Sequence, residues 1–141
     1  MKVPGGQLHV HMNDDARTVP LLIQHDAASA VGIVERVTAS FIGARTVMAF
    51  DMPGSGESDC TIGDRVEVSA YSNVLKSALA ARGLKQIDFY GMWGGGFVGL
   101  ELAIMDPTRV RRLVMSNVFQ HEGEEQKRSE EHTSELQSRF G

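Results

Sequence analysis

Short apolar runs alternate with longer segments of helical periodicity along most of the chain. The longer segments begin near Ala30, Val68 and Gly94 and carry apolar residues at helical spacing. Gly83 is suited to a left-handed helix cap, and Asp106-Pro107 would stop the last helix. The pattern predicts helices at residues 30–42, 68–79 and 94–105, and strands at 8–12, 20–25, 46–51, 87–91 and 111–117.

Strands that alternate with helices of this length favour parallel neighbours joined by right-handed crossovers. The sequence therefore predicts an α/β protein with a mostly parallel sheet and flanking helices. The chain has 141 residues, of which 42% are hydrophobic, enough for one ordinary core. Single α/β domains of roughly 200–250 residues are common, so we expect this chain to be a fragment of one.

Charge and composition narrow the class of partner. The net charge of −4 comes without a basic stripe, which argues against nucleic acid. Cys60 is the single cysteine, so no internal disulfide forms, and a reducing compartment fits. We interpret it as an incidental small residue rather than a nucleophile. No apolar run approaches the roughly 18 residues of a membrane span, and no signal-peptide pattern is present. We expect a soluble cytoplasmic protein with no membrane partner.

The strongest candidate for chemistry is the segment at residues 87–99, Ile-Asp-Phe-Tyr-Gly-Met-Trp-Gly-Gly-Gly-Phe-Val-Gly. It combines a short apolar strand, a glycine-rich corner and the start of a helix, as the nucleophile-elbow motif G-x-S-x-G does. Gly91, Trp93 and Gly95 occupy the three diagnostic positions, so tryptophan stands where the motif has serine. An indole cannot attack a carbonyl as an activated hydroxyl or thiolate does. The pattern predicts the scaffold of an elbow without its nucleophile.

Together with three other segments, this corner resembles the α/β-hydrolase superfamily over roughly residues 7–120. Residues 46–59 are similar to the family's strand and "D-x-P-G-x-G-x-S-D" loop, and residues 103–117 to the helix end, turn and strand that follow the elbow. Residues 20–26 stand where the family has an apolar strand ending in His-Gly. The order and spacing of all four segments agree. The resemblance implies the N-terminal portion of an α/β-hydrolase fold, from a parent that hydrolyses small esters or related carbon-bond substrates.

The resemblance also implies positions for the site. The backbone N–H groups of Gly94 and Ala27 would form the oxyanion hole. Asp26 replaces the family's usual glycine; its carboxylate would oppose the developing negative charge, or it turns away and caps the following helix. Trp93 would point toward a small-molecule substrate, either as packing or as a surface for a small apolar ligand. The family's acid and histidine come later in the chain, so we expect no catalysis by this chain as it stands, and no cofactor.

Three other features admit a functional interpretation. Gly94-Gly-Gly-Phe-Val-Gly99 satisfies the dinucleotide motif G-x-G-x-x-G, although the acid expected about 20 residues later is missing. Asp51 could be a catalytic carboxylate, but a strand end and tight turn explain it better. His9 and His11 alternate along one strand face without a nearby third ligand, so we expect no metal site. We expect His25 to support the loop that follows it.

The C-terminal segment differs in character from the rest. Residues 128–138, Arg-Ser-Glu-Glu-His-Thr-Ser-Glu-Leu-Gln-Ser, match the in-frame translation of a common sequencing-library adapter. We therefore predict a partial α/β-hydrolase-like domain at 1–127 and an artefactual, non-native tail at 128–141, and we exclude His132 as a catalytic base. A genuine polar helical tail is the alternative.

Overall fold

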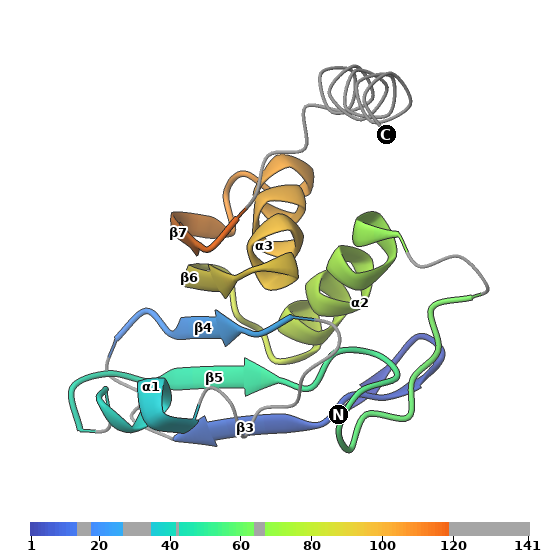
Figure 1. The fold of residues 1–141 in the computed structure, drawn as a ribbon, viewed down its shortest axis with the longest axis horizontal. Coiled ribbons are helices and arrows are strands. Elements are labelled where there is room, and N and C mark those ends of the chain that lie inside the picture. The colour runs from blue at the N-terminus through green and yellow to red at the C-terminus, as the bar shows by residue number, and fades with distance from the viewer. Residues whose placement is uncertain (14–17, 27–34, 42, 64–66, 119–141) are drawn as a thin grey trace, which may run out of the picture.

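A five-stranded sheet organises the chain (Figure 1). The structure, a computed structural model, describes residues 1–13, 18–26, 35–41, 43–63 and 67–118. In spatial order the strands are β3-β5-β4-β6-β7. β5, β4, β6 and β7 run parallel, and β3 pairs antiparallel with β5. The strand bounds are Val10–Asn13 for β3, Leu21–Gln24 for β4, Val47–Phe50 for β5, Ile87–Met92 for β6 and Val110–Ser116 for β7. The predicted α/β class with a mostly parallel sheet is confirmed.

Helices cover both faces of this sheet. α2 (Val68–Ala81) and α3 (Gly94–Met105) pack on one face and share a buried cluster with strand residues such as Leu22. The short helix α1 (Glu35–Ala39) and the turn after it lie on the other face, over a cluster that includes Ile23. Neighbouring residues of one strand thus enter different cores, because successive strand side chains point to opposite faces. This explains why β4 and β5 are buried along their whole length.

The glycine and proline signals in the sequence correctly predicted where α2 and α3 end. Gly83 has φ 69° and follows the last turn of α2, and the N–H of Leu84 donates to the carbonyl of Leu79 at 3.0 Å. This pattern is a Schellman cap, as the glycine predicted. α3 ends at Met105, before Asp106-Pro107. The first predicted helix, at 30–42, was too long at its C-terminal end, because α1 ends at Ala39 in a series of turns. Residues 27–34 and 42 lie outside the described residues.

The structure has a short hairpin at the N-terminus that was not predicted from the sequence. β1 (Lys2–Val3) and β2 (Gly6–Gln7) pair antiparallel around a Pro4-Gly5 turn. Two-residue strands are too short for a recognisable alternation of apolar and polar residues. The Pro-Gly pair was the available signal, since it marks tight turns.

β7 ends the sheet on one side within the part of the chain that the structure describes. Apolar side chains are exposed to solvent at this end of the sheet: Val114 is 56% exposed, and Ile104 of the adjacent helix α3 is 67% exposed. Among the described residues, no helix has the length and apolar character needed to cross a membrane. The predicted tail at 128–141 falls outside the described residues, so the division of the chain at residue 127 stays a prediction.

Candidate active site at the strand–helix corner

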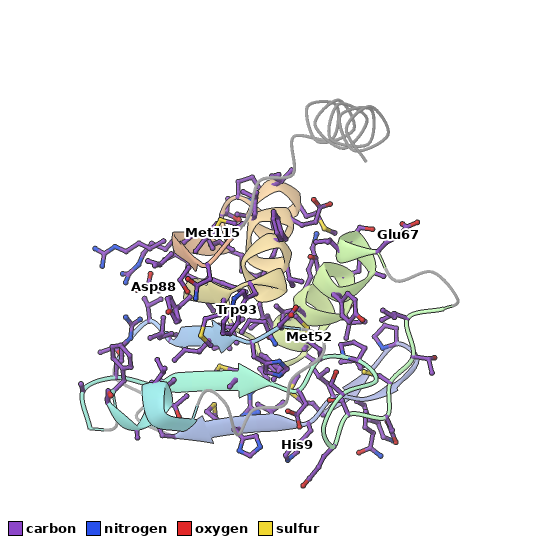
Figure 2. All side chains as sticks on the ribbon, viewed as in Figure 1. His9, Met52, Glu67, Asp88, Trp93 and Met115 are labelled. Carbon is purple, nitrogen blue, oxygen red and sulfur yellow. The ribbon has the colours of Figure 1, made fainter. Side chains whose placement is uncertain are left out.

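Trp93 forms the corner between the last residue of β6 and the first residue of α3 (Figure 2). Its backbone has φ 48° and ψ −124°, a combination that residues with a side chain rarely adopt. Two backbone hydrogen bonds hold it there: the N–H of Trp93 donates to the carbonyl of Ser116 at 3.0 Å, and the N–H of Gly96 donates to the carbonyl of Trp93 at 3.0 Å. Such strain costs about 1–3 kcal/mol and persists only where the surroundings enforce it.

Close approach of backbones explains the glycines around this corner. A Cβ on Gly91 would lie 2.5 Å from the Cα of Gly96, and a Cβ on Gly95 would lie 2.5 Å from the carbonyl oxygens of Gln24 and His25. Helix α3 can therefore pack against β6 and the end of β4 only with glycine at these positions. Gly94, Gly95 and Gly96 already belong to the first turn of α3. Gly99, the last glycine of the segment that resembles a dinucleotide motif, is needed for the same packing, because a Cβ there would lie 2.5 Å from Cε1 of Phe89 in β6.

The side chain at the corner offers an aromatic surface and no nucleophile. The Trp93 indole is 40% exposed, and Phe97, one helical turn later, is 38% exposed. Cys60 is buried away from solvent, and this burial raises the pKa of its thiol. A raised pKa keeps the thiol protonated at neutral pH, and it is the thiolate that attacks. The expectation that Cys60 is not a nucleophile agrees with this environment.

Asp26 lies beside one of the two predicted oxyanion donors. Its Oδ1 atom is so close to the Cα of Gly94 that a side chain at residue 94 would overlap it. The N-terminus of α3 carries a partial positive charge, which favours a carboxylate at this place. The same carboxylate would repel an oxyanion that needed the N–H of Gly94. Ala27, the other predicted donor, lies outside the described residues, so its role stays a prediction.

A second polar cluster gathers beside the end of β5. His9 Nδ1 lies 2.9 Å from Asp51 Oδ2, and one ligand atom each from His9, His11 and Asp51 lie within 4.8 Å of one another. The expectation that the two histidines have no third ligand nearby was wrong. The antiparallel register of β3 and β5 sets His9 opposite Asp51, since the N–H of Asp51 donates to the carbonyl of His9 at 3.2 Å. Strand register over such a sequence separation cannot be read from the sequence.

Asp51 and its neighbour His25 also have the structural roles that the sequence predicted for them. The Asp51 carboxylate accepts a hydrogen bond from the N–H of Glu57 at 3.0 Å, which holds the turn after β5. His25 Nδ1 bonds to the carbonyl of Asp26, the residue that begins the adjoining loop. Both residues therefore support the loops that they were expected to support.

A charged network marks the opposite end of β6 from the corner. Asp88 accepts a bidentate pair of hydrogen bonds from Arg111, at 2.9 and 2.7 Å, and a third from Arg45 at 2.9 Å. The hydrogen bonds from Arg111, followed by the one from Arg45, hold the pKa of Asp88 below its ordinary value. Both guanidinium groups pair with the same carboxylate, so we interpret the network as structural.

The sequence profile of the alpha/beta hydrolase fold family matches residues 32–138. The chain belongs to this family. It is 32% identical over 107 residues to a 2-hydroxymuconate semialdehyde hydrolase of Pseudomonas putida, and the match covers 74% of this chain and 38% of that relative. The chain spans about two fifths of the length of the curated relatives that it matches.

Solved structures agree on the fold. An enol-lactonase from Burkholderia xenovorans LB400 superposes with a TM-score of 0.75 at 18% identity, covering 82% of this chain and 45% of that one. A haloalkane dehalogenase, DbeA from Bradyrhizobium elkani USDA94, gives 0.77 at 16% identity, covering 85% and 41%. At such identities the likeness concerns the fold alone. The resemblance inferred from the sequence motifs is confirmed at the level of family and fold.

Proposed function

We propose that the parent of this chain is a hydrolase of small esters or related carbon-bond substrates, and that the chain as it stands does not catalyse the reaction. Membership of the hydrolase-fold family and the likeness to a semialdehyde hydrolase support the first part. The second part rests on one observation, the indole of Trp93 at the strained corner between β6 and α3.

Hydrolysis through a covalent intermediate needs a nucleophile at the reacting carbon and a base that takes up its proton. The Trp93 indole has no hydroxyl or thiol to supply either the attack or the proton. The corner still fixes residue 93 at the end of β6 and the start of α3, so a side chain with the right chemistry would stand at the same place. The Asp26 carboxylate beside Gly94 is a second obstacle, because it opposes an oxyanion there.

The test compares the purified chain with its Trp93→Ser variant. We expect neither to hydrolyse p-nitrophenyl acetate above the background rate, and we expect a serine-directed fluorophosphonate to leave both unlabelled. The second expectation follows from our proposal that no general base assists residue 93, since such help typically contributes about 10²–10⁴-fold. Trp93→Ala serves as the matched control. Turnover by the unchanged chain, or stoichiometric labelling of Trp93→Ser at the new serine, would contradict the proposal.

A second candidate function is the binding of a small apolar ligand at the same corner. The observation that favours it is the partly exposed pair Trp93 and Phe97 on a corner held by backbone hydrogen bonds. The chain has one tryptophan, so fluorescence excited at wavelengths that the two tyrosines do not absorb reports on this corner alone. Saturable fluorescence changes on titration with small aromatic esters, weakened by Phe97→Ala, would support binding. A linear, non-saturating response in both proteins would refute it.

A further inference from the structure

We propose that His9, His11 and Asp51 form a binding site for a divalent transition-metal cation such as Zn²⁺, separate from the corner at Trp93. Two imidazoles and one carboxylate are ligand types that zinc and related cations accept. His11 lies in β3, His9 lies just before this strand, and Asp51 follows directly after β5. His9 and His11 are two residues apart and therefore project from the same face of the strand.

The distances suit coordination. Ligand atoms bound to one ion at about 2.0–2.1 Å stand roughly 3.0–3.5 Å apart. His9 Nδ1 and Asp51 Oδ2 are already 2.9 Å apart, and one ligand atom from each of the three residues lies within 4.8 Å of the other two. His11 is exposed, so a change of its side-chain rotamer can close the remaining gap. Binding would replace the proton between His9 and Asp51 with the cation.

Glu57 is positioned to orient the His9 ring, as a carboxylate outside the ligand set often does in metal sites. Its Oε2 atom lies 3.3 Å from His9 Nε2, the ring nitrogen that does not face Asp51. Histidines that bind metals usually donate their other N–H to a carboxylate or carbonyl, which fixes the tautomer and the ring orientation. With Nε2–H directed to Glu57, His9 can offer the lone pair of Nδ1 to a cation that replaces the proton between Nδ1 and Asp51.

His25 is a buried neighbour of the proposed ligand Asp51. Its side chain is fully buried, its Nδ1 bonds to the carbonyl of Asp26, and its Nε2 has no hydrogen-bond partner. That nitrogen lies 3.8 Å from Asp51 Oδ1, too far for a hydrogen bond. A divalent cation bound to Asp51 would place positive charge near this buried nitrogen, which has no other polar partner among the described residues.

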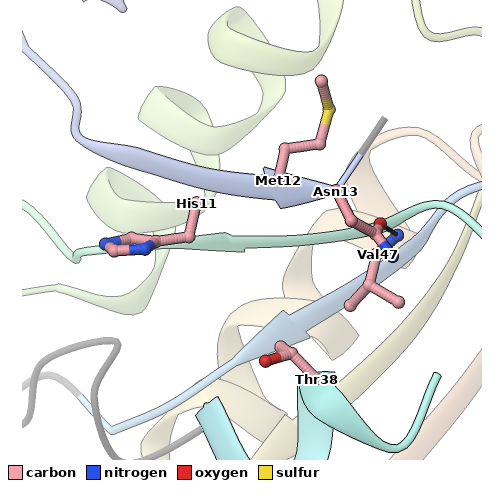
Figure 3. Close-up of a pocket in the computed structure, with 5 residues that line it drawn as sticks. All are labelled: His11, Met12, Asn13, Thr38 and Val47. Atoms are coloured by element: carbon pink, nitrogen blue, oxygen red, sulfur yellow. Dashed lines mark hydrogen bonds between the residues drawn. The ribbon is translucent and has the colours of Figure 1, made fainter. Parts of the chain in front are cut away.

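An ion can reach the site from solvent. His11 lines a cavity of about 220 Å³ together with Met12, Asn13, Thr38 and Val47 (Figure 3). Met12 projects from the strand in a different direction from His11, as the same view shows. It is also 36% exposed, which makes it a suitable control position on the same strand.

The experiment is a calorimetric titration of the full chain with ZnCl₂. We expect saturable binding of one Zn²⁺, a loss of affinity of at least about tenfold in His11→Ala, and no change in Met12→Ala. Glu57→Gln should weaken binding less than His11→Ala does, because it removes an outer partner rather than a ligand. His11 and Glu57 are exposed, so both variants should fold.

Cobalt provides a spectroscopic check of the same ligands. We expect Co²⁺ to give the visible absorption bands of a protein-bound ion in the unchanged chain and in Met12→Ala, and weaker bands in His11→Ala. The proposal is overturned if the unchanged chain binds no zinc saturably. It is also overturned if His11→Ala keeps the same stoichiometry and affinity, since the binding then belongs to other histidines.

Discussion

The backbone of Trp93 allows a sharp test of the strained corner. Trp93→Ala removes the indole but keeps Cβ, so it retains the unfavourable φ of 48°. Trp93→Gly removes the indole and the strain together. The strain is about 1–3 kcal/mol, and it opposes the extra freedom of glycine in the unfolded chain, about 0.5–1 kcal/mol. We therefore expect Trp93→Gly to be more stable than Trp93→Ala by roughly 0.5–2 kcal/mol.

The free energy of unfolding can be measured by urea denaturation followed by far-ultraviolet circular dichroism, because both variants lack the single tryptophan. Leu100 provides the matched control, since it lies inside α3 and is 41% exposed. There the order should reverse, with Leu100→Ala more stable than Leu100→Gly by about 1 kcal/mol. If Trp93→Ala proved as stable as Trp93→Gly while the Leu100 pair behaved normally, the corner would not be strained and its assignment as an elbow would fail.

Two further substitutions test the charges at the two ends of β6. Asp88→Asn should lower the free energy of unfolding at pH 7 by about 1–2 kcal/mol, a modest figure because the released Arg111 is 39% exposed and regains water. The pKa of Asp88 is lowered in the folded state, so its contribution is present above the unfolded value of about 3.9 and is lost as the pH falls through the folded value. The difference between the two proteins in urea titrations should thus shrink below about pH 4, and a constant difference would refute the ion-pair explanation. At the corner, adding Asp26→Gly to Trp93→Ser should speed the slow reaction that a large excess of fluorophosphonate forces over prolonged incubation by roughly tenfold, because a carboxylate beside Gly94 no longer opposes the oxyanion. Equal labelling rates would show that Asp26 does not act on that site.

Much of the fold could be predicted because its signals are local. The cap at Gly83 depends on the conformational freedom of one residue, and the stop at Asp106-Pro107 depends on proline. The fully buried strands β4 and β5 read as continuous apolar runs, as strands covered on both faces do. The β1–β2 hairpin was missed since its strands are too short to carry a pattern.

For the candidate sites, too, some features follow from the sequence and others only from the tertiary structure. The sequence by itself determined that residue 93 carries an indole instead of a nucleophile, and that glycines flank it, because these are facts of residue type and spacing. Tertiary structure alone decided that Asp51 joins His9 and His11, and that the Asp26 carboxylate lies against Gly94. Those neighbours come from segments distant in the chain. Their contacts are set by strand order and register, which depend on how whole elements bury their apolar faces together.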